Sequence, residues 1–199
     1  MRLILVRHGI TEHNKKGCFL GDIDSPLSPN QTLSGMVKKV LSYKPDLIIS
    51  SPKKRALSTA QLISDMISVE EDIKELSFGE WEGLTPKEVS LNDKYFTDLK
   101  RWQSRNATAN TRPTGGESLA ELENRVENVL NNLYKKFSDK TVVIVTHVYV
   151  IKAILDMGYN VPTGWHSNRL WLTNGAITML DWHPNDEKRL VHCVNCVYE

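Results

Sequence analysis

The sequence predicts one α/β domain over residues 1–199, a three-layer sandwich with a mostly parallel central sheet. Three short apolar runs rich in Ile, Leu and Val are typical of strands buried on both faces: Leu3–Val6, Leu47–Ile49 and Val142–Val145. Helical patterns alternate with these runs, which favours βαβ units over an all-helical or all-strand chain.

The first helices follow from local signals. Pro52 is expected at the first position of a helix whose apolar residues recur at helical spacing: Ala56, Leu57, Ala60, Leu62 and Ile63. The segment Ser118–Glu121 has the capping-box pattern and precedes a long amphipathic stretch. We therefore expect a long helix that packs on the sheet through Leu119, Leu122, Val126, Val129, Leu130 and Leu133.

A helical cap is expected between these elements, at roughly residues 77–116. Thr85–Glu88 is a second capping box, and the apolar residues after it predict one helix over the crevice: Leu91, Tyr95, Leu99 and Trp102. Residues 103–116 are rich in Asn, Thr and Gly and predict a loop. Alternation over Ala176–Leu180 and Leu190–Tyr198 predicts two late strands at a sheet edge.

The composition excludes several classes of function. Hydrophobic residues make up 40% of the chain and charged residues 25%, as in a globular protein. With 25 Lys+Arg against 24 Asp+Glu, the net charge of +1 does not favour nucleic acid or an anionic membrane as a partner. The run Leu3–Val6 is too short for a signal-peptide core or a membrane span. Three cysteines give no disulfide framework, so we expect a cytoplasmic protein.

Polar residues follow each of the three buried strands. Arg7 and His8 end the first, Ser50 and Ser51 the second, and Thr146 and His147 the third. Ligands of open α/β sheets bind outside the carboxyl ends of the strands, so these segments should meet in one crevice. Arg55, in the first turn of the helix after the second strand, joins them there.

Two guanidinium groups, two imidazoles and helix N-termini suit a small dianion, and phosphate fits best. A lone His or Arg at a strand end is more often solvated or paired, but four together favour a binding site. An imidazole among cations stays neutral and can attack phosphorus, so His8 is a candidate nucleophile. The leaving alkoxide needs a carboxylic acid, and spacing alone leaves Glu75, Glu80 and Glu82 open.

Five segments in order resemble the histidine phosphatase superfamily, which includes the cofactor-dependent phosphoglycerate mutases. They are Arg7–Asn14 (RHGITEHN), Gly21–Leu27, Ser50–Ala60, Glu75–Gly83 with Gly115–Ser118, and Val145–His147. The later segments are most similar to α-ribazole phosphatases and broad-specificity phosphatases. The resemblance covers most of the chain and implies a phosphoglycerate mutase-like fold.

The resemblance also implies roles for particular residues. His8 would be the phosphorylated nucleophile and Glu75 the proton donor, while Arg7, Arg55 and His147 would hold the phosphoryl oxygens. Substrate-binding positions would be Asn14, Gly21 and Val148. The implied activity is that of a histidine acid-type phosphatase, a phosphoric monoester hydrolase acting on a small-molecule ester such as α-ribazole phosphate, without a metal or other cofactor.

Three departures from the family pattern bear on the pocket. Ile10 replaces Glu or Gln beside the site, Asn30-Gln31 replaces Glu-Gly before a helix, and Val148-Tyr149 replaces a small pair after His147. The last change is expected to narrow the pocket. A mutase and a non-catalytic phosphate-binding module remain alternatives.

Two other features are expected to be structural. Cys193 and Cys196 lie three residues apart, so in a regular strand their thiols would point to opposite faces and could share a metal only if the chain turned there. The tryptophans are expected to pack in the core or under the cap: Trp81, Trp102, Trp165, Trp171 and Trp182.

Overall fold

A computed structural model describes all residues of the chain, 1–199. Its strands are β1 (Arg2–Arg7), β2 (Leu47–Ser50), β3 (Ser68–Val69), β4 (Thr141–Thr146), β5 (Ile177–Asp181) and β6 (Leu190–Cys196). Its α-helices are α1 (Glu12–Lys16), α2 (Ser34–Ser42), α3 (Lys54–Gln61), α4 (Pro86–Ser90), α5 (Asp93–Gln103), α6 (Leu119–Phe137) and α7 (Val148–Gly158). Short 3₁₀ turns occupy Glu71–Ile73, Gly79–Trp81 and Asp186–Lys188.

The strands form one six-stranded sheet in the order β3-β2-β4-β1-β5-β6. The pairs β2·β3, β2·β4 and β1·β4 are parallel, whereas β5 is antiparallel to both β1 and β6. The predicted α/β class and mostly parallel sheet are confirmed. The two late strands extend one edge of the sheet, as predicted.

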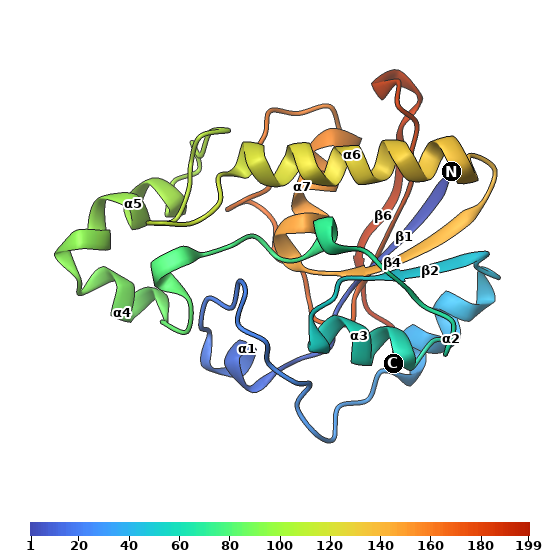
Figure 1. Ribbon diagram of the computed structural model, residues 1–199, viewed down its shortest axis with the longest axis horizontal. Coiled ribbons are helices and arrows are strands. Elements are labelled where there is room, and N and C mark those ends of the chain that lie inside the picture. The colour runs from blue at the N-terminus through green and yellow to red at the C-terminus, as the bar shows by residue number, and fades with distance from the viewer.

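Helices cover both faces of the sheet, with α6 and α7 on one face and α2 and α3 on the other (Figure 1). Successive side chains of a strand point to opposite faces, so each central strand serves two cores. In β1, Leu3 and Leu5 join the core under α6 and α7, while Ile4 and Val6 join the core under α2 and α3. Because both faces of these strands are buried, their sequences are apolar without interruption.

The carboxyl ends of β1, β2 and β4 lie side by side. Arg7 pairs with Thr146, and Ser50 pairs with Val145 of the same strand. The next residues remain linked, since His8 N–H donates to the Thr146 carbonyl at 3.0 Å and Ser51 N–H to the Val145 carbonyl at 3.0 Å. The crevice predicted from the sequence is therefore present at this edge.

The helix after β2 differs in detail from its prediction. It begins at Lys54, after Lys53 as N-cap, and not at Pro52. Its buried residues are Arg55, Ala56, Thr59 and Ala60, with Ile63 just beyond its end, whereas Leu62 is 51% exposed. Arg55 and Thr59 lie on the buried face because they point toward the crevice. The spacing of apolar residues does not predict such polar residues.

The segment between β3 and α6 holds two helices in place of the one predicted. The capping box at Thr85 starts α4, which ends at Ser90, and the side chain of Asn92 caps a second helix, α5. Leu91 lies between them and is 77% exposed, while Leu99 and Trp102 are buried. Both helices lie apart from the sheet (Figure 1). The division into one domain with a cap at roughly 77–116 stays a prediction.

The capping box at Ser118 does begin the long helix α6, as predicted. Strand β6 is less regular than expected, because Asn195 adopts a left-handed conformation with φ of 56° and the register to β5 shifts. The chain thus bends between Cys193 and Cys196, and the pKa of the Cys193 thiol is raised by burial and by Cys196. None of the helices combines the length and apolar content that a membrane crossing requires.

Candidate active site

His8 follows the last residue of β1 and is almost completely buried. Its Nδ1 lies 2.6 Å from the Gly9 carbonyl oxygen, which can only accept a hydrogen bond. In the neutral ring the hydrogen is therefore on Nδ1, and the lone pair is on Nε2, which makes no hydrogen bond to the protein. Burial, and then the charges of Arg55 and Arg7, hold the pKa of His8 well below its usual value. The ring is therefore neutral at physiological pH, with its Nε2 lone pair unprotonated.

Arg7 and Arg55 supply two buried positive charges beside His8. Arg7 Nη1 donates to the Leu172 carbonyl, and Arg55 donates to the carbonyls of Ile23 (2.7 Å) and Gly21 (3.0 Å). Burial lowers the pKa of Arg7 to about 10 and also lowers that of Arg55. No carboxylate forms an ion pair with either guanidinium, although Glu75 acts on both charges from a distance, so both groups can still pair directly with an anion in the pocket.

Three buried nitrogen atoms of this region have no hydrogen-bond partner: Arg7 Nε, Arg55 Nε and His147 Nδ1. Buried polar atoms in folded proteins are almost always paired, so an unpaired one needs an explanation. A phosphoryl group, with several acceptor oxygens, would supply partners for such nitrogen atoms. Their clustering at one place is evidence for an anion site.

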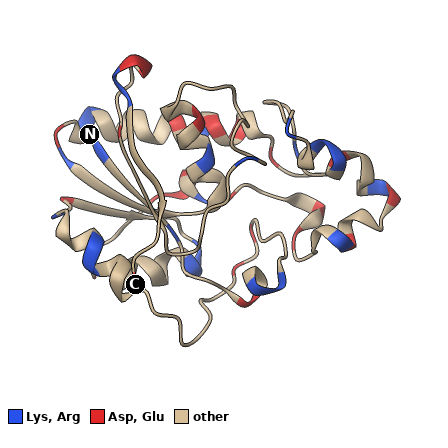
Figure 2. Cartoon of the chain, turned by 180° about the vertical axis from the view of Figure 1, so that it is seen from behind, with Lys and Arg blue, Asp and Glu red and all other residues tan.

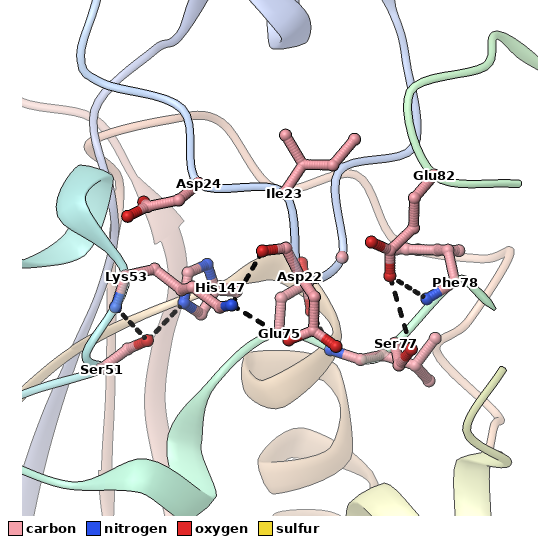
Figure 3. Close-up of polar contacts among 12 residues, drawn as sticks. Asp22, Ile23, Asp24, Ser51, Lys53, Glu75, Ser77, Phe78, Glu82 and His147 are labelled. Atoms are coloured by element: carbon pink, nitrogen blue, oxygen red, sulfur yellow. Dashed lines mark hydrogen bonds and ion pairs between the residues drawn. The ribbon is translucent and has the colours of Figure 1, made fainter. Parts of the chain in front are cut away.

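His147 is the N-cap residue of α7 and lies behind His8, with their ring centroids 5.1 Å apart. Its Nε2 lies 2.7 Å from Ser51 Oγ, which also accepts from the Lys53 N–H at 3.4 Å (Figure 3). The Ser51 hydroxyl can therefore donate a hydrogen bond to Nε2 of His147. In the neutral His147 ring the hydrogen is then on Nδ1. Burial is the main reason that the pKa of His147 is also well below its usual value.

Glu75 is buried at the same site, and burial raises the pKa of its carboxyl group. Its Oε1 accepts from the backbone N–H groups of Leu76 (3.0 Å) and Tyr149 (3.2 Å), which fixes the side chain against the N-terminus of α7. Arg125 of α6 donates to the Glu75 carbonyl and pairs with Glu117 at 2.7 Å, so the backbone is held as well. A carboxyl group with a raised pKa is suited to donate a proton.

The structure separates Glu75 from the two other acids that spacing left open. Glu80 is exposed and pairs with Lys94 at 2.5 Å, and that contact lowers its pKa. Glu82 accepts hydrogen bonds from Phe78 N–H and the Ser77 hydroxyl (Figure 3). Of the three, only Glu75 lines the pocket that contains His8.

This catalytic pocket has a volume of about 230 Å³. Its lining includes most of the site residues expected from the sequence: Arg7, His8, Asn14, Arg55, Glu75 and Val148. Asn14 Oδ1 accepts from Thr11 N–H and Asn174 Nδ2, which leaves the Asn14 amide hydrogens for a ligand. His147 is completely buried and lies outside the lining.

Gly21 does not line the pocket either. Its carbonyl oxygen accepts a hydrogen bond from Arg55 Nη2, which does line the pocket. It adopts φ of +52°, and a Cβ atom there would lie 2.1 Å from Glu82 Oε1. Glycine is therefore required for the loop to approach Glu82 and to present its carbonyl to Arg55. The geometry gives Gly21 a positioning role.

Tyr149 lines the pocket beside Val148, as expected from the sequence, whereas several other lining residues were not expected: Gly17, Cys18, Phe19, Leu20, Phe78, Trp171 and Asn174. The prediction that the tryptophans pack inside was wrong for Trp171, which is 80% exposed at the pocket, and for Trp165, which is also exposed. It was right for Trp81, Trp102 and Trp182. Trp171 follows no regular element, so periodicity carried no signal for it.

Two of the family departures contact each other. Gln31 Oε1 accepts from Ile10 N–H at 2.8 Å, and Gln31 Nε2 donates to the Ile10 carbonyl at 3.0 Å. Ile10 is not among the residues that line the catalytic pocket, although it follows His8 by two residues. Gln31 closes the loop before α2 and does not cap that helix, whose N-cap is Leu33.

Comparison with known proteins agrees with this geometry. The chain matches the profile of the histidine phosphatase superfamily (branch 1) over residues 3–195. It belongs to that superfamily. Among curated members, it is 36% identical over 160 residues to phosphoserine phosphatase 1 of Hydrogenobacter thermophilus, covering 77% of this chain and 74% of the relative. It is 31% identical to the adenosylcobalamin/α-ribazole phosphatase of Salmonella typhimurium, covering 83% and 84%.

Solved structures of histidine phosphatases have the same fold. Phosphoserine phosphatase from Entamoeba histolytica, in complex with 3-phosphoglyceric acid, superposes with a TM-score of 0.84 at 30% identity. The match covers 98% of this chain and 97% of that one. The sequence resemblance to the superfamily, including its α-ribazole phosphatases, is therefore confirmed.

Proposed function

We propose that the protein is a phosphomonoesterase that hydrolyses a small-molecule phosphate ester through a phosphohistidine intermediate. The observation that carries this proposal is the His8 Nδ1 to Gly9 carbonyl contact, because it leaves a lone pair on Nε2 in a pocket with two arginines. The relatives include phosphoserine and α-ribazole phosphatases, which supports the same class of substrate.

In the first step, His8 Nε2 attacks phosphorus in line, and the bond from phosphorus to the ester oxygen breaks. Glu75 gives its proton to that oxygen, so the leaving group departs as a neutral alcohol. In the second step, Glu75 takes a proton from water, the water oxygen bonds to phosphorus, and His8 is released as the neutral ring. Arg7, Arg55 and the N–H of His147 stabilise the charge on the equatorial oxygens in both transition states.

Phosphatase and mutase activity use the same residues but differ in the groups that surround the leaving group. A mutase must hold a second phosphate while its phosphohistidine is kept from water. The cations of the cap segment do not line the catalytic pocket: Lys87, Lys94, Lys100, Arg101, Arg105 and Arg112. Three of them pair with acids instead, and both basic and acidic residues occur along this segment (Figure 2). This favours hydrolysis.

The test is incubation with 3-phosphoglycerate and 2,3-bisphosphoglycerate, followed by measurement of free phosphate and 2-phosphoglycerate. We expect net release of phosphate with little isomer. Formation of 2-phosphoglycerate much faster than free phosphate would assign the mutase reaction to the same residues. Absence of turnover on these esters and on a panel of nucleotide, sugar and α-ribazole phosphates would favour a binding module.

Metal removal is expected to leave hydrolysis unchanged, because arginines and imidazoles, and not a cluster of carboxylates, supply the charge for the phosphoryl group. No group of three His, Cys, Asp or Glu side chains in the chain is arranged to hold a metal ion. Turnover of p-nitrophenyl phosphate should be measured after exhaustive EDTA treatment. A loss that only added metal restores would contradict the proposal.

A cytoplasmic location also remains part of the proposal. All three cysteines are free, which fits a reducing compartment.

A further inference from the structure

A second pocket adjoins the catalytic pocket. It has a volume of about 400 Å³, and the two pockets share Tyr149 and Trp171 as walls. The remaining lining residues come from α7 and from the segment after it: Lys152, Ser167, Asn168, Arg169 and Leu170. A substrate whose phosphoryl group lies at His8 could extend past Tyr149 into this space.

Lys152 is a cation inside the wall of this second pocket. It lies one turn after Tyr149 in α7 and is only 8% exposed. Its Nζ donates to the Ser167 carbonyl at 2.6 Å and lies 4.8 Å from the centre of the Tyr149 ring. Asp156, one turn further along α7, pairs with His166 at 2.6 Å and not with Lys152.

No carboxylate forms an ion pair with Lys152, although Glu75 and Asp156 both act on its charge from a distance. An ammonium group in a buried site is costly unless an opposite charge accompanies it. Burial lowers the pKa of Lys152 to about 8, against the opposing effect of Glu75. Because Glu75 and Arg7 both act on this pKa, Lys152 lies within electrostatic range of the catalytic groups.

Two other groups of the second pocket are also without an anionic partner. Arg169 is exposed, stacks on Trp165 at 4.0 Å and donates to the Trp165 carbonyl, but pairs with no acid. The Ser167 hydroxyl oxygen is buried and has no hydrogen-bond partner. An anion in the pocket would find a buried ammonium, a guanidinium and a hydroxyl group together.

We propose that this pocket is a second anion subsite, in which Lys152 and Arg169 hold a carboxylate of the leaving group. The inference rests on the proposed phosphatase function and narrows it to phosphate monoesters of hydroxy acids. A carboxylate fits better than a second phosphate, because only one of the two cations is buried and a monoanion matches its single charge.

The test compares two substrates that differ by one carboxylate, O-phosphoserine and O-phosphoethanolamine. In the wild-type enzyme, kcat/KM for phosphoserine should exceed that for phosphoethanolamine by about tenfold or more, as expected for a charge-assisted hydrogen bond. Lys152→Met should reduce this ratio by about tenfold, mainly through KM for phosphoserine. Lys87→Met, which removes an exposed cation of α4, is the matched control and should keep the wild-type ratio.

The pH dependence gives a readout that a purely structural lysine would not produce. Protonated Lys152 binds the carboxylate, so the phosphoserine preference should fall as pH rises through about 8. Both substrates have a phosphate monoester and a primary amino group, and both need Glu75, so the ratio is much less sensitive to those titrations than either rate alone. The other charged or titratable groups near Lys152 are Arg7, Glu123, Tyr149, Asp156 and His166, together with Arg169, which stays charged across this pH range and so adds no titration of its own.

The outcomes separate this inference from the proposed function. If neither substrate nor p-nitrophenyl phosphate is hydrolysed, the proposed function fails. If esters are hydrolysed but the ratio is near one, or if α-ribazole phosphate is preferred, the second subsite is wrong and the phosphatase stands. Should Lys152→Met fail to fold, Arg169→Gln and the wild-type pH profile decide. A ratio unchanged in Arg169→Gln and constant across pH 8 would overturn the inference.

Discussion

Replacement of His8 by alanine is expected to lower turnover by about 10⁴-fold or more, because no other imidazole lines the pocket to replace it as the attacking group. The fold should be retained, since the His8 ring lies at the pocket and belongs to neither hydrophobic core. Thermal unfolding of the variant should resemble that of the wild type. The steady-state release of phosphate from p-nitrophenyl phosphate measures the loss.

Trapping of the intermediate tests the same residue directly. Wild-type enzyme quenched during turnover of labelled substrate should contain a phosphoenzyme that is labile in acid and stable in alkali, as a phosphoramidate is. His8→Ala should contain none. His192→Ala is the control, because His192 of β6 pairs with Asp181 of β5 and lies outside the catalytic pocket. A fully active His8→Ala enzyme, or label at His192, would contradict the mechanism.

The sheet and the convergence of His8, Arg55 and His147 could be predicted because both depend on local patterns. Strands buried on two faces must be apolar throughout, and the carboxyl ends of parallel strands must lie together. The prediction therefore needed only three apolar runs and the polar residues after each. The short edge strand β3 carried no such pattern, since Ser68 and Val69 are exposed.

Other features depend on how segments pack, and the sequence carried no signal for them. The assignment of the acid to Glu75 follows from its contact with Tyr149 N–H, a residue 74 positions away. Lys152 lies in an apolar stretch of α7, and its burial depends on the Ser167 segment that folds over it. The exposure of Trp171 likewise depends on a segment without regular structure, where side-chain direction has no period.

Replacement of Glu75 by glutamine is expected to slow the phosphorylation step by about 10²- to 10⁴-fold on alkyl phosphates, the usual contribution of a general acid. The glutamine oxygen can still accept from Leu76 and Tyr149 N–H, so the side chain should keep its place. With p-nitrophenyl phosphate the loss should be much smaller, because nitrophenolate leaves without a proton. The nitrophenol burst in single-turnover experiments isolates this step from the later hydrolysis.

The pH dependence of the phosphorylation rate is an independent test of the role of Glu75. Burial raises the pKa of Glu75, so its carboxyl group stays protonated to a higher pH than the carboxyl group of an exposed glutamate does. The fraction of enzyme with protonated Glu75 then falls as pH rises through that pKa. The phosphorylation rate on an alkyl phosphate should fall along this alkaline limb, and Glu75→Gln should lack the limb. Glu80→Gln, which removes an exposed acid paired with Lys94, should retain it. An equal loss on both leaving groups, with the alkaline limb intact, would mean that Glu75 only positions α7 and that Glu82 is the acid to test.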